Sequence, residues 1–99
     1  MTALPGELEA CDAAAQKRVE RYGLQQELEA GLVDFAAGWV AHRDGVDMAD
    51  ARHEHCQDRY PWVDDRVAGE RDFEAGYDAR GAWLARRKRD EKEPDGVRQ

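Results

Sequence analysis

Apolar residues at the start of the chain recur at intervals of three or four positions. This spacing places them on one face of an α-helix. Pro5 suits a first helical turn and Gly23 suits a C-terminal cap, so the pattern predicts a helix over residues 5–22. A single glycine destabilises a helix by only about 1 kcal/mol relative to alanine, so one long bent helix through Gly23 is an alternative. The apolar stripe consists of Leu4, Leu8, Cys11, Ala15, Val19 and Tyr22.

Three further segments are predicted to be helical, and specific residues separate them. Asp47 can cap the third helix, and Pro61 ends it because proline lacks the backbone N–H that a continuing helix needs. Asp44 and Gly45 close the second helix. The plan is two helical hairpins in tandem. The predicted ranges of the second, third and fourth helices are 24–43, 48–60 and 63–89.

The two halves of the chain contain a similar sequence. Residues 21–41 align with residues 59–79 without a gap at an offset of 38 positions, and nine of the 21 pairs are identical. The alignment predicts an internal repeat, with units at about 5–43 and 47–90. Two hairpins are too few for an open solenoid, so we predict an all-α protein in which they close into a small four-helix bundle or open out and dimerise.

The matched residues fall on one face of each helix when they are plotted at 100° per residue. Glycine inside a helix carries an entropic penalty, so glycines at the same places in both units indicate that a side chain there would clash with a neighbouring helix. We interpret this face as a packing surface, and a ligand-facing groove is the alternative. The repeated residues are Gly31, Asp34, Phe35, Gly38 and Trp39 in the first unit and Gly69, Asp72, Phe73, Gly76 and Tyr77 in the second.

The repeated aspartates need partners if this face is buried. An unpaired carboxylate among small apolar residues would be strongly destabilising. Arg21 and Arg59 are repeated together with Asp34 and Asp72, so we expect these arginines to pair with the aspartates. The catalytic alternative is an acid and base pair of carboxylates, but the spacing brings neither a nucleophile nor a histidine to them.

Composition supports a single helical domain. The chain has 99 residues, of which 37% are charged, and it is rich in alanine, glutamate and arginine. We expect the domain to cover residues 1–92, with a disordered tail at 93–99. The chain has neither a long apolar run nor a signal peptide, so we expect a cytoplasmic protein without membrane contact. In that compartment Cys11 and Cys56 are expected to be free, buried thiols.

Charge is unevenly distributed along the chain. The formal net charge is −7, residues 80–92 carry a net +4, and the remainder therefore carries −11. An acidic body repels phosphate, which makes nucleic-acid binding unfavourable as the main activity. The alternative is a small nucleic-acid-binding protein that uses the basic end of the last helix. Its residues would be Arg80, Arg86, Arg87, Lys88 and Arg89.

One cluster resembles a metal site. His53 and Cys56 are three positions apart, and Cys11 or His42 could complete a tetrahedral set for zinc. The spacing matches neither the metalloprotease pattern nor a pair of Cys-x-x-Cys motifs. A metal-dependent enzyme is therefore only an alternative, and we expect no bound metal, no cofactor and no catalytic residues.

Some residues distinguish the second unit from the first. Trp62 lies at a corner between helices, where it could either cover the core or stand exposed as an anchor for a partner. We expect protein binding at residues of this second unit, namely Trp62, Glu74, Asp78, Arg80 and Trp83.

The pattern Phe-x-x-Gly-Tyr-x-x-Arg-x-x-Trp, at Phe73, Gly76, Tyr77, Arg80 and Trp83, resembles short segments in small helical proteins of phages and other mobile elements. The resemblance covers about a fifth of the chain, and it implies an accessory protein that acts by binding, in some cases as an inhibitor of host defence. The function that we predict is a non-enzymatic acidic helical protein that binds another protein as an adaptor or inhibitor. In a sharper version, its carboxylates imitate the phosphates of nucleic acid.

Overall fold

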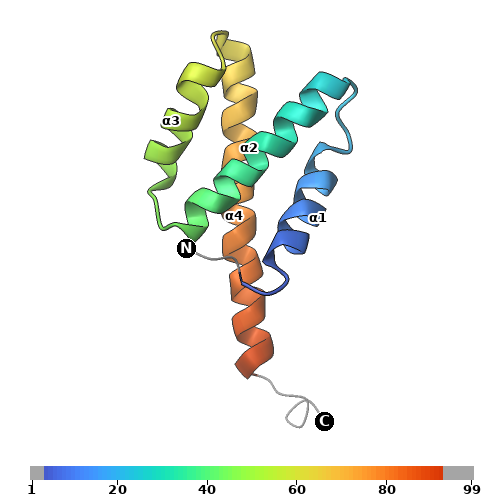
Figure 1. Ribbon diagram of the computed structural model, residues 1–99, viewed down its shortest axis with the longest axis vertical. Helices are drawn as coiled ribbons and strands as arrows, with labels where there is room; N and C mark the ends of the chain where they lie inside the picture. Colours follow the sequence, from blue (N-terminus) through green and yellow to red (C-terminus); the bar gives the residue numbers. More distant parts are fainter. Residues whose placement is uncertain (1–3, 93–99) are drawn as a thin grey trace.

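The computed structural model describes residues 4–92, and it describes side chains as far as residue 89. It contains the helices α1 (Glu7–Val19), α2 (Gln25–Arg43), α3 (Met48–Arg59) and α4 (Val63–Lys92), with no strand in this range. The helices pack as a small bundle, which confirms the prediction of an all-α fold (Figure 1). The predicted tail at 93–99 lies outside the described residues.

The helix ends follow the predicted breaks in the second half of the chain and differ in the first. The carboxylate of Asp47 accepts a hydrogen bond from the Asp50 N–H at 3.2 Å, and Gly45 closes α2 with a φ of 73°. Pro5 precedes α1, which begins after Gly6 in the left-handed conformation. Because α1 already ends at Val19, Gly23 lies in the connection, and α1 and α2 are two helices.

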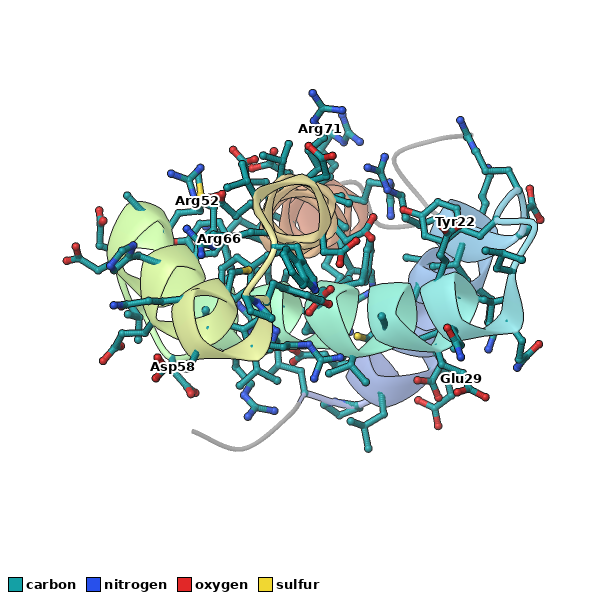
Figure 2. All side chains as sticks on the ribbon, turned by 90° about the horizontal axis from the view of Figure 1, so that it is seen from above. Tyr22, Glu29, Arg52, Asp58, Arg66 and Arg71 are labelled. Carbon is teal, nitrogen blue, oxygen red and sulfur yellow. The ribbon has the colours of Figure 1, made fainter. Side chains whose placement is uncertain are left out.

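Helices α2 and α4 form the centre of the bundle. They run in the same general direction and cross one another, while α1 and α3 lie on opposite sides of the crossed pair (Figures 1 and 2). Helix α1 packs against α2 and α4, and α3 packs against the same two helices. Each predicted hairpin is therefore present, and the two hairpins meet through their second helices.

The crossing point lies at two of the repeated glycines. A Cβ atom on Gly38 would overlap the carbonyl oxygen of Phe73 and stand 2.8 Å from its carbonyl carbon. A Cβ atom on Gly76 would meet the carbonyl group of Phe35 in the same way, again 2.8 Å from the carbon. Only glycine allows the two backbones to approach this closely, as the packing interpretation expects. The contacts are equivalent in the two halves, while the duplication itself stays a prediction.

The buried face of α1 differs from the predicted apolar stripe. Leu8 is 65% exposed and Leu4 is 39% exposed, whereas Glu7 is buried. The buried positions of α1 are four residues apart, and they are Glu7, Cys11, Ala15 and Val19. The prediction for Leu4 and Leu8 was wrong because a charged partner inside the bundle makes Glu7 the favourable buried residue.

Candidate functional site

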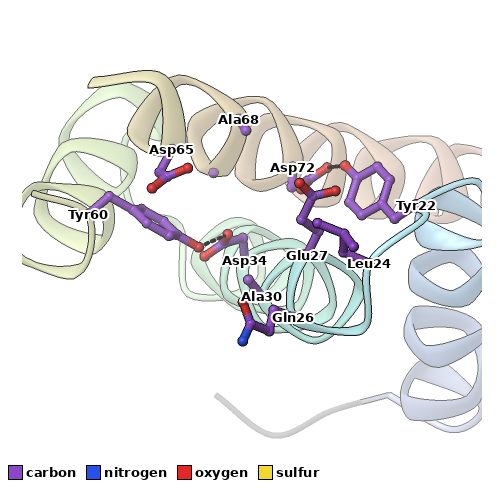
Figure 3. Close-up of a pocket in the computed structure, with 12 residues that line it drawn as sticks. Tyr22, Leu24, Gln26, Glu27, Ala30, Asp34, Tyr60, Asp65, Ala68 and Asp72 are labelled. Carbon is purple, nitrogen blue, oxygen red and sulfur yellow. Dashed lines mark hydrogen bonds between the residues drawn. The ribbon is translucent and has the colours of Figure 1, made fainter. Parts of the chain in front are cut away.

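A cleft opens between the N-terminal parts of α2 and α4 (Figure 3). Its volume is about 520 Å³. From the glycine crossing the two helices diverge, and small residues form the walls: Ala30 and Gly31 on α2, Ala68 and Gly69 on α4. Because these side chains are so short, the space between the helices is left unfilled.

Asp34 lies at the inner end of the cleft, and both of its carboxylate oxygens have hydrogen-bond or ion-pair partners. The Tyr60 hydroxyl donates to Oδ2 of Asp34. His55 Nε2 lies 2.7 Å from Oδ1, and Arg59 Nε lies 3.2 Å from the same oxygen. The carboxylate is 1% exposed, so burial is compensated by three partners on α3 or at its end.

Asp72 occupies the matched position on α4 and takes its partners from α1 and the turn after it, on the opposite side of the crossed pair from α3. The Tyr22 hydroxyl donates to Oδ1 at 2.6 Å, and Arg18 Nε donates to the same oxygen at 3.0 Å. Tyr22 also covers Gly31, where a Cβ atom would stand 2.9 Å from Cε2 of the ring. A Cβ atom on Gly69 would likewise overlap the ring of Tyr60. Each tyrosine thus packs on a glycine of its own half and bonds to the aspartate of the other half.

The arginine partners agree with the sequence prediction for one aspartate and correct it for the other. Arg59 pairs with Asp34, as expected, but the partner of Asp72 is Arg18 and not Arg21. Helix α1 ends at Val19, so Arg18 is still on the helix, whereas Arg21 lies in the turn and is exposed. The early end of the helix therefore removes Arg21 from the buried face.

The two tyrosines that bond to the aspartates and both cysteines keep their protons at neutral pH. Burial and the hydrogen bond to Asp34 raise the pKa of Tyr60 to about 12, and burial with the bond to Asp72 raises the pKa of Tyr22. Burial also raises the pKa of both Cys11 and Cys56 to about 11. Both thiols are free and buried, which confirms that prediction, and thiols in this state are poor nucleophiles.

Substituting Asp34 tests whether these contacts stabilise the fold. We expect Asp34→Asn to lower the free energy of unfolding by about 2 kcal/mol, because it weakens a buried group that three donors surround. The melting temperature would fall by roughly 10 °C. Arg21→Gln, on the exposed turn, should change stability by under about 0.5 kcal/mol. Thermal unfolding of both variants measures the difference, and equal melting temperatures would contradict the buried-pair interpretation.

A second buried network lies at the other end of α2. Glu7 is 1% exposed and accepts hydrogen bonds from Arg80 Nε at 2.6 Å, from Trp39 Nε1 at 2.7 Å and from the Leu4 N–H at 3.0 Å. Arg80 Nη1 also lies 3.0 Å from His42 Nδ1. Burial opposes ionisation of Glu7, but the bond from Arg80 and the other donors outweigh it and lower the pKa to about 2. Sequence reasoning missed Glu7, although its four-residue spacing from Cys11 was visible.

The predicted protein-binding residues do not form one surface. Arg80 is 6% exposed and bound to Glu7, so the structure places it inside the bundle instead of on a binding face. Trp83 is partly buried, with its ring 5.8 Å from that of Trp39. Glu74 pairs with Arg52 at 2.9 Å, and Asp78 is exposed. Trp62 lies about 30 Å from Trp83 along the axis of α4 and is 72% exposed.

The structure also shows where the predicted basic residues of α4 lie and whether a metal site is present. Arg86, Lys88 and Arg89 are exposed near the end of α4, while Arg87 donates to the carbonyl oxygen of Pro5 at 3.1 Å. Among the side chains of residues 4–89, no group of three or more His, Cys, Asp or Glu is arranged to hold a metal ion. In the same range no helix is long and apolar enough to cross a membrane.

The cleft therefore combines walls that contain small residues with two buried aspartates, and exposed residues surround its mouth.

Comparisons with protein-family models, curated proteins and solved structures give no match to this chain.

Proposed function

We propose that this protein acts without catalysis, by binding another protein at the rim of the cleft. We define the rim as the cleft residues Leu24, Glu27 and Asp65, together with Trp62, which follows the cleft residue Tyr60 by two positions in the sequence. The observation that carries the proposal is the 72% exposure of Trp62, together with the 63% exposure of Leu24. Large exposed apolar side chains next to a cleft are typical of interaction sites, and tryptophan is enriched among the residues that dominate binding energy.

Charge supports a partner with a basic surface. Glu27 and Asp65 are exposed beside the two apolar rim residues, and the chain outside residues 80–92 carries a net charge of −11. Such a surface accelerates association with basic proteins and repels acidic ones. An adaptor or an inhibitor in the cytoplasm fits this surface, including an accessory protein of a phage or mobile element. Imitation of nucleic-acid phosphates is the sharper version of the same proposal.

A second candidate function is supported by the end of α4. This part of the helix projects beyond the rest of the bundle and exposes Arg86, Lys88 and Arg89 (Figure 1). These residues could bind nucleic-acid phosphates, although Arg80 and Arg87 are engaged within the protein. Salt-dependent binding of duplex DNA that is lost when residues 86–89 become alanine would favour this candidate.

Two substitutions at the rim and one control substitution test this proposal. Affinity capture from the native host should recover a partner with the unmodified protein, and Trp62→Ala or Leu24→Ala should reduce the recovery about tenfold or more. Leu8→Ala is the control, because Leu8 is 65% exposed near the start of α1 and does not line the cleft. Recovery should also fall as salt rises, most steeply for a nucleic-acid mimic. Equal recovery with all three variants would contradict the proposal.

A further inference from the structure

The cleft has room for a group from outside the chain. Its volume is about 520 Å³, and Ala30 and Ala68 on the facing helices extend only methyl groups into it. Tyr22 and Tyr60 also line it, but both are held at its sides by their bonds to the aspartates.

The two buried aspartates differ in how many of their carboxylate oxygens accept a hydrogen bond. Both oxygens of Asp34 accept bonds, since Oδ1 faces His55 and Arg59 and Oδ2 accepts from Tyr60. In Asp72 both bonds go to Oδ1, and no donor within residues 4–89 bonds to Oδ2. This oxygen faces the wall at Gly31, 3.2 Å from the position of a Cβ atom there, on a side chain that is 4% exposed. Although the side chain as a whole is buried, Oδ2 is not fully shielded from solvent, so it is an acceptor that a donor in the cleft could reach.

The mouth of the cleft adds two negative charges. Glu27 on α2 and Asp65 on α4 lie on opposite walls and are exposed, with their carboxylates free of ion pairs in the described part of the chain (Figure 3). Arg18 and Arg59 offset the charge of the inner aspartates, so the net negative charge of the cleft comes from its mouth. A cation entering between the two walls would meet both mouth carboxylates before it reaches Asp72.

We propose that the cleft binds the side chain of a single arginine on the partner protein. The guanidinium would donate to Asp72 Oδ2, and the aliphatic stem would lie against Ala30 and Ala68. Arginine fits better than lysine because its planar group presents several donors at fixed angles and keeps its charge when it is partly desolvated. The inference rests on the proposed function, because it names the chemical feature of the partner that the rim would help to position.

Titration with N-acetyl-arginine amide tests this site without knowledge of the partner. With ¹⁵N-labelled protein, the amide signals of Ala30, Gly31, Ala68 and Gly69 should shift, with a dissociation constant in the millimolar range that is typical of one side chain. N-acetyl-citrulline amide, which has the same shape without the charge, should cause shifts at least about tenfold smaller at equal concentration. Equal shifts with both probes, or shifts confined to other helices, would overturn the proposal.

Charge variants distinguish binding in the cleft from general attraction of the arginine probe to an acidic protein. Glu27→Gln with Asp65→Asn should weaken binding of the arginine probe about fivefold to tenfold. Glu29→Gln with Asp78→Asn removes the same charge from exposed positions of the same two helices outside the cleft, and it should change the affinity less than about twofold. Ala68→Leu, at an exposed wall position, should abolish binding by filling the cleft while the protein stays folded. If the two charge variants behave alike, the cleft is not the site.

Other occupants would give different results. If the same amide signals shift with protein concentration alone, a second copy occupies the cleft and the proposal is overturned. If putrescine binds more than about tenfold more tightly than the arginine probe, the cleft is a site for free amines and the docking of a partner arginine is wrong. If Trp62→Ala abolishes partner capture but Ala68→Leu leaves it unchanged, the proposed function stands and the arginine inference fails. If the probe binds in the cleft but Leu24→Ala and Trp62→Ala do not affect capture, the rim proposal fails.

Discussion

Alanine at Gly38 or Gly76 is expected to lower the melting temperature by about 10–20 °C. The added Cβ atom would overlap the carbonyl group of Phe73 or Phe35, and these are backbone atoms that cannot rotate away. Helices α2 and α4 would have to separate, which loosens the packing of the buried Phe35 and Phe73 side chains. Overpacking costs about 1–3 kcal/mol or more, and the higher end applies where backbone meets backbone. The gain in helix propensity offsets only about 1 kcal/mol.

Gly81 is the matched control within α4. A Cβ atom there would stand 3.3 Å from Nε2 of the His42 side chain, which can move by a few tenths of an ångström. Gly81→Ala should therefore change the melting temperature by only a few degrees, because helix propensity and the tighter contact nearly cancel. Thermal unfolding of the three variants makes the comparison. If Gly38→Ala and Gly81→Ala have the same melting temperature, close contact of the two backbones does not determine the stability of the bundle.

The helices themselves could be predicted because local chemistry sets them. Asp47 and Gly45 act within one turn of the residues that they cap or terminate. The end of α1 was predicted three residues too late, since Tyr22 continues the apolar spacing. Its side chain instead reaches Asp72, which is 50 positions away in the sequence. A tertiary contact thus produced a periodicity that resembles a longer helix.

The repeated face has two uses that the sequence pattern could not separate. Packing and a ligand-facing groove were alternatives for the same residues, and α2 has both a packed crossing and an open cleft, while a ligand for the cleft stays a proposal. Gly38 lies at the crossing of the helices, whereas Gly31 lies where they have diverged and lines the cleft. The angle between two helices depends on their packing in three dimensions. The residue types therefore identified the repeated face of α2, but they did not identify the point at which α2 and α4 diverge to form the cleft.

The buried charged residues also could not be predicted, because their burial depends on contacts between residues that are far apart in the sequence. Leucine at position 8 was predicted to be buried in preference to glutamate at position 7, as transfer free energies favour. That preference reverses only when Arg80 and Trp39 provide donors, and they lie 73 and 32 positions away. Arg80 was in turn expected on the surface, because its partner could not be identified from the sequence.

Glu7→Gln is expected to destabilise the protein by about 3 kcal/mol at neutral pH. The pKa of Glu7 is about 2 in the folded protein, against an ordinary value of 4.5, and each unit of pKa corresponds to about 1.4 kcal/mol. The substitution also leaves the charge of Arg80 uncompensated inside the bundle. Glu9→Gln is the control, because Glu9 lies in the same first turn of α1 but is exposed, and it should change stability by under about 0.5 kcal/mol.

The effect of Glu7→Gln should depend on pH in a defined direction. Because the folded pKa lies below the unfolded value, the ionised carboxylate stabilises the fold fully above about pH 5, and this stabilisation is lost as the pH falls from 4.5 towards 2. Urea unfolding across this range should therefore show a large gap between the unmodified protein and Glu7→Gln at pH 6 that closes near pH 2. A gap that stays constant would mean that shape rather than charge makes Glu7 important. Since Arg80 bonds to both Glu7 and His42, the carboxylate at the start of α1 also holds α2 and α4 together at this end of the bundle.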